Sequence, residues 1–406
     1  MRPADRLLFA ILVGAVAGVA AGWWFGPVMV GWGWLCDLFL DALKMTILPL
    51  VVTAIICGVA PLGAAHSVGR ASAITGVFIV ASTLVATSTG VIVADILEPG
   101  AGPGNLPTVN AASAAGASDT SIESVIRTII SPNLVAAAVD GQILPIMLFA
   151  LLLALALAGS GARGKPVIEL AEGLNDALMR LIGWILYLSP VGIFALLGAR
   201  FGELGGAGFW REVTSVGRYV VSVGTGLGVH FMTLAGLAAL AGFPPRRYAM
   251  TLLRALVTAF GTGSSAATLP VAMDCAAQAG VRAPVVRFVL PLRTALNRNG
   301  TALYQATVAM FIAQVYGIEL SLAQQVIVVI TAALAGISTA GVPQHGIVTL
   351  VIALTAAHLP AEGIGLIVAV DWFLDRCRTM INVWGNAVGA AIVHRLAGAA
   401  EQTGAV

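Results

Sequence analysis

The sequence predicts an all-α polytopic membrane protein, and three observations lead to that class. Hydrophobic residues make up 59% of the 406 residues, charged residues make up 10%, and mean hydropathy is +0.96. A soluble domain carries about 25% charged residues, so this chain is too apolar to cover its surface in water. The apolar residues also fall in runs of roughly 20 residues or more, the length of a helix that spans a bilayer.

Six such runs predict membrane-spanning helices in the first part of the chain. The first is too long for a cleaved signal peptide and more spans follow it, so we expect it to be retained as the first helix. The runs cover residues 6–26, 38–62, 72–97, 126–159, 178–202 and 213–242.

Basic residues alternate between the connections, which predicts the orientation of the chain. Lys or Arg residues precede the first run, separate the second from the third and the fourth from the fifth, and follow the sixth, whereas residues 27–37 and 98–125 contain none. The positive-inside rule therefore places the N-terminus in the cytoplasm and makes 98–125 an extracellular loop. We expect a multi-pass protein of the cell membrane (inner or plasma membrane), in contact with lipids.

Composition also argues against several classes of function. A net charge of +2 gives no nucleic-acid footprint. The four cysteines are scattered, which favours neither a disulfide framework nor a zinc site. Because the sequence has no metal-ligand cluster, nucleophile–base pair or cofactor motif, we expect no enzyme activity, no cofactor and no bound metal.

The second half differs because small polar residues and glycine interrupt its apolar runs. The interruptions are GTGSSAATLP (Gly261–Pro270), LNRNGTALYQ (Leu296–Gln305) and ISTAGVPQHG (Ile337–Gly346). Irregular backbone at membrane depth is tolerated only where protein buries it or where it lines a cavity. Paired interrupted segments indicate the binding site of a transporter, so the first and third interruptions, about 75 residues apart, predict two re-entrant hairpins around a broken helix.

The last apolar segment carries polar residues on one helical face. Asp375, Arg378, Thr379, Asn382 and Asn386 follow one another at steps of one, three or four residues. Such charges are unfavourable in a membrane unless they are paired or hydrated. A zwitterion would use three of them: Asp375 for an ammonium group, the fork of Arg378 for a carboxylate and the amide of Asn382 for a second carboxylate. The alternative is that the aspartate and the arginine neutralise each other.

These motifs resemble those of the glutamate transporter homologues, the dicarboxylate/amino acid:cation symporter family, over nearly the whole chain. The matching segments are KMTILPLVV (Lys44–Val52), SPNLVAAAVDGQILPIMLFALLLALAL (Ser131–Leu157), LSPVGIFAL (Leu188–Leu196), SSAATLP, NRNGTALYQ, TAGVP and DRCRTMINVWGN. The resemblance implies eight transmembrane helices plus two re-entrant helical hairpins. It also implies a homotrimer in which a transport domain moves as an elevator against a scaffold and the second hairpin acts as the gate.

Domain boundaries follow from the same resemblance. The scaffold comprises 1–71 (helices one and two) and 126–205 (helices four and five). The transport domain comprises 72–97 (helix three) and 206–406 (helix six, both hairpins, helices seven and eight), and 98–125 is the extracellular loop.

The resemblance assigns a substrate site for an acidic amino acid. Asp375 matches the residue that binds the ammonium group, and Arg378 matches the one that selects the side-chain carboxylate. Asn382, with the backbone around Ser264 and Ser265, matches the site of the main-chain carboxylate. The remaining matches are Thr301 and the backbone of Gly346 as helpers, Val342 and Pro343 at the gate tip, and Thr379 on the same helical face.

The sodium sites of the family depart from its pattern here. The family's helix-seven motif Asn-Met-Asp-Gly-Thr reads Asn297-Arg298-Asn299-Gly300-Thr301, so an arginine replaces methionine and an amide replaces a carboxylate. Asn386 replaces a second aspartate, Arg293 replaces a glycine, and Ile79 replaces a tyrosine, while Ser82 and Thr83 keep their hydroxyls. Like charges about 4 Å apart repel by about 4 kcal/mol at an effective dielectric of 20. We therefore predict that the guanidinium of Arg298, alone or with that of Arg293, is a covalently attached cation that takes the place of a bound sodium ion. The alternative is that both arginines point elsewhere, toward headgroups or Asp371, and sodium still binds.

The resulting hypothesis is a sodium-independent carrier of aspartate or glutamate, working as an exchanger, a uniporter or a proton-coupled symporter. The alternatives are a sodium- or proton-coupled dicarboxylate symporter, which leaves Asp375 without an ammonium partner, an anion channel, favoured by the extra arginines, and an inactive relative.

Overall fold

The computed structural model confirms the all-α prediction, because every regular element among the described residues is helical. The described residues are 3–64, 70–101, 130–140, 142–338, 350–351, 353–355, 357 and 359–402. The gate-tip residues Val342 and Pro343 and the helper Gly346 lie outside them.

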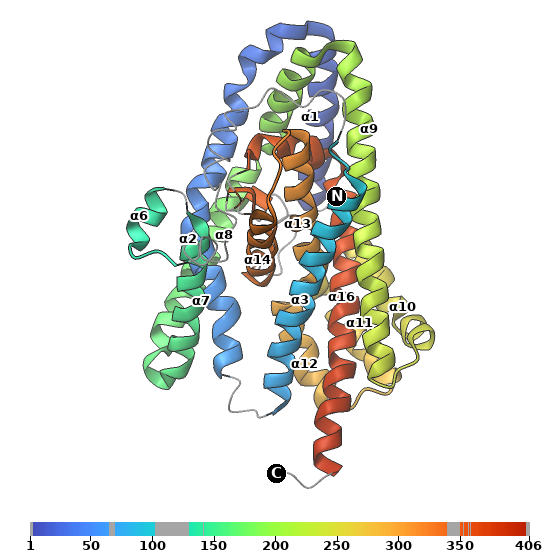
Figure 1. Ribbon diagram of the computed structural model, residues 1–406. Coiled ribbons are helices and arrows are strands. Elements are labelled where there is room, and N and C mark those ends of the chain that lie inside the picture. Colours follow the sequence, from blue (N-terminus) through green and yellow to red (C-terminus); the bar gives the residue numbers. More distant parts are fainter. Residues whose placement is uncertain are drawn as a thin grey trace.

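The elements of the first half are mostly long helices (Figure 1). They are α1 (Pro3–Phe25), η1 (Gly26–Trp32), α2 (Trp34–Ala64), α3 (Arg70–Leu97), α6 (Leu134–Val139), α7 (Ile143–Gly159), η3 (Gly161–Arg163), α8 (Lys165–Leu186) and α9 (Ser189–Leu240).

The second half consists of shorter helices followed by one long one. They are α10 (Pro245–Thr262), α11 (Ser265–Gln278), α12 (Ala283–Leu296), α13 (Asn299–Val315), α14 (Leu322–Ser338), η4 (Ala361–Ile364) and α16 (Gly365–Gln402).

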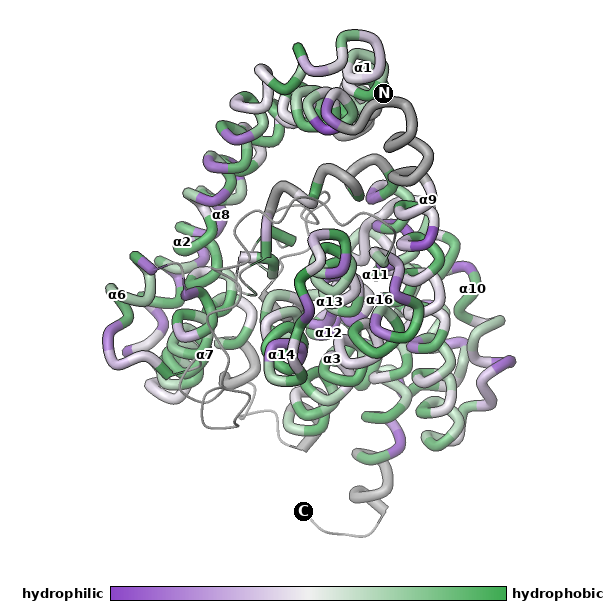
Figure 2. The backbone as a smooth tube through the Cα atoms, turned by 45° about the horizontal axis from the view of Figure 1, so that its top comes forward, coloured by the Kyte–Doolittle hydropathy of each residue, from purple (hydrophilic) through white to green (hydrophobic). Residues whose placement is uncertain are grey.

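Four stretches among the described residues are long and apolar enough to cross a membrane. They are Phe9–Trp32, Trp34–Ala60, Ala73–Leu97 and Thr214–Leu240. A fifth is possible if the pair Gly161–Leu186 and Ser189–Glu203, bent by 51°, counts as one span. Figure 2 shows hydrophobic residues predominating along most of these helices, as expected for a multi-pass membrane protein.

The predicted spans agree with α1, α2 and α3 but were wrong in three later places. The run 126–159 is not one helix, because α6 ends at Val139 and α7 begins only at Ile143. The run 178–202 is not one straight helix. Its first part belongs to α8, which already starts at residue 165; the first turns of α8 are amphipathic, so they do not stand out as an apolar run. The chain then bends between residues 186 and 189. The predicted runs leave 203–212 as a connection between two helices, yet α9 continues through it. That interval contains glycine but no proline, and glycine alone weakens a helix by only about 1 kcal/mol.

Close packing of α1 against α9 depends on small residues. A side chain at Gly14, Gly18 or Gly22 would run into the backbone of α9 at Pro190, Phe194 or Gly198, respectively. A glycine at every fourth position lets two helix backbones approach closely, which is how helices associate in lipid. This contact joins the first helix to the long helix that runs beside α3 and α16 (Figure 1).

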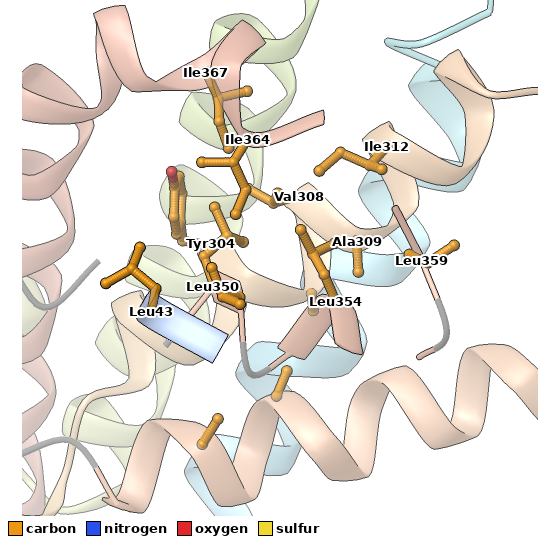
Figure 3. Close-up of a cluster of buried hydrophobic side chains, with 14 of the residues drawn as sticks. Leu43, Tyr304, Val308, Ala309, Ile312, Leu350, Leu354, Leu359, Ile364 and Ile367 are labelled. Carbon is orange, nitrogen blue, oxygen red and sulfur yellow. The ribbon is translucent and has the colours of Figure 1, made fainter. Parts of the chain in front are cut away.

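Helix α13 lies at the centre of the molecule and is buried along almost its whole length. One face packs on α3, where the Thr307 hydroxyl donates to the Gly90 carbonyl at 3.3 Å. Figure 3 shows another face packed by side chains that precede α16, among them Leu350, Leu354 and Ile364, with Leu43 of α2 beside them. The middle of α13 is therefore held on two faces, and the candidate site is built around its first turn.

Candidate substrate site

Two of the three predicted interruptions are present, and a new helix begins after each of them: α11 at Ser265 and α13 at Asn299. Helix α10 ends at Thr262, and the next residue, Gly263, has a φ of +59°, a left-handed conformation that glycine adopts without strain. Ser264 then caps α11, because its hydroxyl accepts a hydrogen bond from the Ala267 amide at 3.2 Å. The third interruption follows α14 and falls outside the described residues.

The second break separates α12 from α13 by two residues with non-helical backbone, Asn297 and Arg298. The first turn of α13 is held by α16: the Gly300 amide donates to Asn382 Oδ1 at 2.8 Å, and Asn382 Nδ2 donates to Thr301 Oγ1 at 3.2 Å. A side chain on Gly300 would meet the Arg378 carbonyl of α16. The amide of Asn382 therefore fixes the start of one helix against another.

Arg378 is the charged centre of the site. It is 1% exposed, and its Nη2 donates to Asp375 Oδ1 at 2.7 Å while its Nη1 lies 3.1 Å from Asp371 Oδ1. The guanidinium carbon lies 3.9 Å from the centre of the Tyr304 ring, a cation–π geometry. The Tyr304 hydroxyl donates to Asp371 Oδ1 at 2.7 Å. The pairing that the sequence left open as an alternative, Asp375 with Arg378, is thus present.

The first break comes close to these charges. A Cβ built on Gly263 would lie 3.6 Å from Asp375 Oδ2, so the tip before α11 faces the carboxylate of α16. The Asp375 side chain is 33% exposed and remains reachable, in contrast to Arg378. Thr379 donates its hydroxyl to the Asp375 carbonyl one turn earlier and is 5% exposed, so it is a helix-internal contact here. Ser265, in the first turn of α11, is 9% exposed.

Comparison with known proteins decides the family. Residues 7–396 match the sodium:dicarboxylate symporter family. The chain belongs to this family. Two similar proteins are the neutral amino acid transporter B(0) of Oryctolagus cuniculus, 33% identical with 99% of this chain and 82% of the relative covered, and excitatory amino acid transporter 3 of Homo sapiens, 33% identical with 89% and 78% covered. A third is excitatory amino acid transporter 1 of Ambystoma tigrinum, 32% identical with 91% and 78% covered. This sodium:dicarboxylate symporter family protein is thus a multi-pass membrane transporter.

Beside the candidate substrate site, three buried asparagines form a cluster at positions where the sequence predicts former sodium sites. Asn297 Nδ2 donates to Asn386 Oδ1 at 2.9 Å, and Asn386 Nδ2 lies 3.5 Å from Thr294 Oγ1. Asn299 Oδ1 lies 3.3 Å from the Thr83 hydroxyl. All three asparagines are at most 2% exposed, so the cluster is closed to water.

The two arginines that replace family residues lie in different places. Arg293, in the last turn of α12, is 0% exposed and donates from Nη2 to the Gly385 carbonyl at 3.1 Å. Gly385 also adjoins the Nδ2 atoms of Asn299 and Asn297. Arg298 is half-buried and close enough to Asp375 for their charges to attract, and its Nε has no hydrogen-bond partner among the described residues. It is therefore Arg293, rather than Arg298, that lies beside the amide cluster.

These residues do not fit a sodium ion. Hard cations bind oxygen ligands, amide carbonyls among them, but the fully buried guanidinium of Arg293 lies beside these amides and would repel a sodium ion. Nowhere in the described residues do three His, Cys, Asp or Glu side chains gather as metal ligands would. Ser82 and Thr83, expected near a former sodium site, both donate to the Ile79 carbonyl of their own helix.

Three residues of this region were not singled out by sequence. Tyr304, Gly385 and Gly389 are not among the residues that the sequence predicts for the site. Tyr304 lies one turn after Thr301 on α13, and the glycines follow Asn382 and Asn386 by three residues each on α16. Residues three positions apart lie on the same face of a helix, so this spacing from predicted site residues could have identified all three.

Proposed function

We propose that this protein is a sodium-independent carrier of acidic amino acids, aspartate or glutamate. The proposal rests on one arrangement: a carboxylate and a guanidinium on α16, Asp375 and Arg378, beside the tip before α11 and the start of α13. An acidic amino acid carries one ammonium and two carboxylates, which this set complements. The names of the relatives, excitatory and neutral amino acid transporters, support an amino acid as the substrate.

Each group of the substrate has a partner in this proposal. The ammonium binds the reachable carboxylate of Asp375. One carboxylate binds the fork of Arg378, which matches a carboxylate in geometry. The other carboxylate takes the hydroxyl hydrogen of Thr301, which already accepts from Asn382, and the N-terminal end of α11 at Ser264, where free amides and the helix dipole favour an anion.

The pairing of Asp375 with Arg378 becomes a step of binding in this account. The substrate carboxylate replaces Asp375 on Nη2 of Arg378, and the released aspartate receives the substrate ammonium. Asp371 and Tyr304 keep the guanidinium in position throughout. Because every charge has a partner before and after, the exchange avoids an unpaired buried ion, which would be strongly unfavourable.

Sodium independence is supported by the amide cluster and Arg293. A cation that is covalently attached cannot be released on the other side of the membrane, so it cannot couple transport to a sodium gradient. Exchange, uniport and proton coupling are all compatible with this site.

The wider organisation in the proposal follows the family resemblance. A scaffold (1–71 and 126–205) holds a homotrimer together, and a transport domain (72–97 and 206–406) moves as an elevator, with the segment after α14 as gate. The N-terminus is cytoplasmic and the membrane is the cell membrane.

Uptake by purified protein in liposomes tests the proposal. Saturable L-aspartate or L-glutamate uptake, equal with sodium or choline outside and inhibited weakly by succinate, is the expected result. Uptake of succinate in preference to aspartate would make it a dicarboxylate carrier. A current that does not saturate, without aspartate accumulation or exchange, would make it an anion channel.

A further inference from the structure

Arg293 is a buried cation without a counter-charge in the described part of the chain. It is 0% exposed, its one hydrogen bond goes to the Gly385 carbonyl, and its Nε and Nη1 have no hydrogen-bond partner among the described residues. Its guanidinium carbon lies 4.6 Å from the centre of the Phe78 ring of α3. Burying an unpaired charge is strongly unfavourable, so the burial of this arginine needs a structural or functional explanation.

The backbone of α16 is shaped to receive this guanidinium. A Cβ on Gly389 would collide with Cζ, Nε and Nη1 of Arg293, so the position must remain glycine while the arginine is there. Gly385, one turn earlier, supplies the carbonyl and adjoins two amides of the cluster. We call Gly385, Gly389 and Phe78, from two helices, the guanidinium seat.

The charge also lies where α12 ends. The Asn297 amide donates to the Arg293 carbonyl at 2.7 Å, and the chain then leaves the helix. A helix C-terminus carries partial negative charge and favours a cation. One side chain therefore bridges the end of α12 to the turn of α16 that follows Asn382, the residue that holds the first turn of α13.

We propose that the guanidinium seat is a monovalent-cation site filled permanently by Arg293, which positions the break between α12 and α13 for substrate binding. This inference rests on the proposed function, and it makes Arg293 a residue that positions the substrate site without contacting the substrate. If the seat is a cation site, removing the side chain leaves a space of guanidinium size that free guanidinium ion refills.

The test is chemical rescue of the Arg293→Ala variant. Binding of L-aspartate to purified protein is measured in millimolar guanidinium chloride, well below unfolding concentrations, with choline chloride as the matched salt. We expect the variant to bind at least about tenfold more weakly than wild type and guanidinium, but not choline, to restore most of the affinity. Arg287→Ala is the matched control, because Arg287 is exposed on the same helix: it should bind normally and ignore guanidinium.

Three further variants distinguish the effect of the charge from the effect of side-chain volume and from the effect of the guanidinium seat. Arg293→Lys should retain more affinity than Arg293→Met, since lysine keeps a cation and methionine keeps only bulk. Gly389→Ala should weaken binding as Arg293→Ala does but should not respond to guanidinium, because the seat itself is blocked. Wild-type affinity in Arg293→Met, or equal responses to guanidinium and choline, would overturn the inference.

Failure of the proposed function is distinguishable from failure of this site. If wild type binds no acidic amino acid, the melting temperature replaces binding as the readout. Guanidinium should then raise the melting temperature of Arg293→Ala relative to choline and leave wild type unchanged. No difference between the two salts on Arg293→Ala would reject the cation site on its own.

Discussion

Two buried arginines, Arg378 and Arg293, lie in similar surroundings but differ in their partners. Both are at most 1% exposed, and each lies over an aromatic ring, Tyr304 or Phe78. Arg378 contacts two carboxylates, whereas Arg293 has a single backbone carbonyl among the described residues. An arginine bound to carboxylates can exchange one of them for the carboxylate of a ligand. In the part of the chain that the structure describes, Arg293 contacts only a backbone carbonyl and an aromatic ring, in the space left by a glycine. It has no carboxylate there to exchange for that of a ligand, so it is suited to a fixed position.

Removing the exchangeable arginine should have the largest effect. Arg378→Ala leaves the carboxylates of Asp371 and Asp375 without their cation and removes the fork proposed to bind the substrate carboxylate. Truncating one partner of a buried, hydrogen-bonded charge pair costs about 2–5 kcal/mol in binding. We expect a loss of more than about 100-fold in aspartate affinity, measured by binding to purified protein. Arg376→Ala, two positions earlier with its guanidinium on Trp372, is the control and should stay near wild type. Similar losses in both variants would remove the distinction between the two positions.

Removing the carboxylate that exchanges should change which ligand is preferred. Asp375→Asn loses a charged hydrogen bond to the ammonium, worth about 1.5–3 kcal/mol, so aspartate should bind roughly 30-fold more weakly. Succinate has no ammonium and should compete better relative to aspartate than in wild type. Asp274→Asn, on α11 and paired with exposed Arg254, is the control. An unchanged ratio of succinate to aspartate would show that Asp375 does not hold the ammonium.

Restoring family residues around the fixed arginine should create a response to sodium. The variant Arg293→Gly with Asn299→Asp and Asn386→Asp removes one cation and adds two carboxylates beside the same turn of α16. We expect sodium to strengthen aspartate binding by about tenfold, within the usual range of coupling between sites. Arg293→Gly alone is the comparison and should respond less. The same response in both would show that the carboxylates do not form a cation site.

The smallest effect is expected from the hydroxyl that supports Arg378. Tyr304→Phe keeps the ring under the guanidinium but loses the hydrogen bond to Asp371. One such bond is worth about 1 kcal/mol, so aspartate affinity should fall about fivefold. Tyr187→Phe, at an exposed position, should have no effect. A loss as large as that of Arg378→Ala would mean that the tyrosine hydroxyl contacts substrate directly.

The sequence predicted the breaks near Gly263 and Asn297, because glycine and small polar residues interrupt apolar runs there. It also predicted the polar face of α16, because steps of three and four place Asp375, Arg378 and Asn382 together. The long α9 was missed, since helix continuation through 203–212 depends on packing rather than hydropathy.

The choice between the two substituting arginines could not be made from sequence. Arg298 lies within the recognised motif and was favoured, whereas Arg293 lies one turn before it. What places Arg293 beside the amides is the absence of a side chain at Gly389, on a helix almost 100 residues away in the chain. The periodicity of residues along α12 carries no information about the space that a glycine leaves on the surface of α16.

Aspartate affinity of the wild-type protein, titrated with sodium against choline, tests the central claim most directly. If Arg293 fills the cation position, the dissociation constant should be the same within about twofold at every sodium concentration. A dissociation constant that falls steeply as sodium rises would contradict the account.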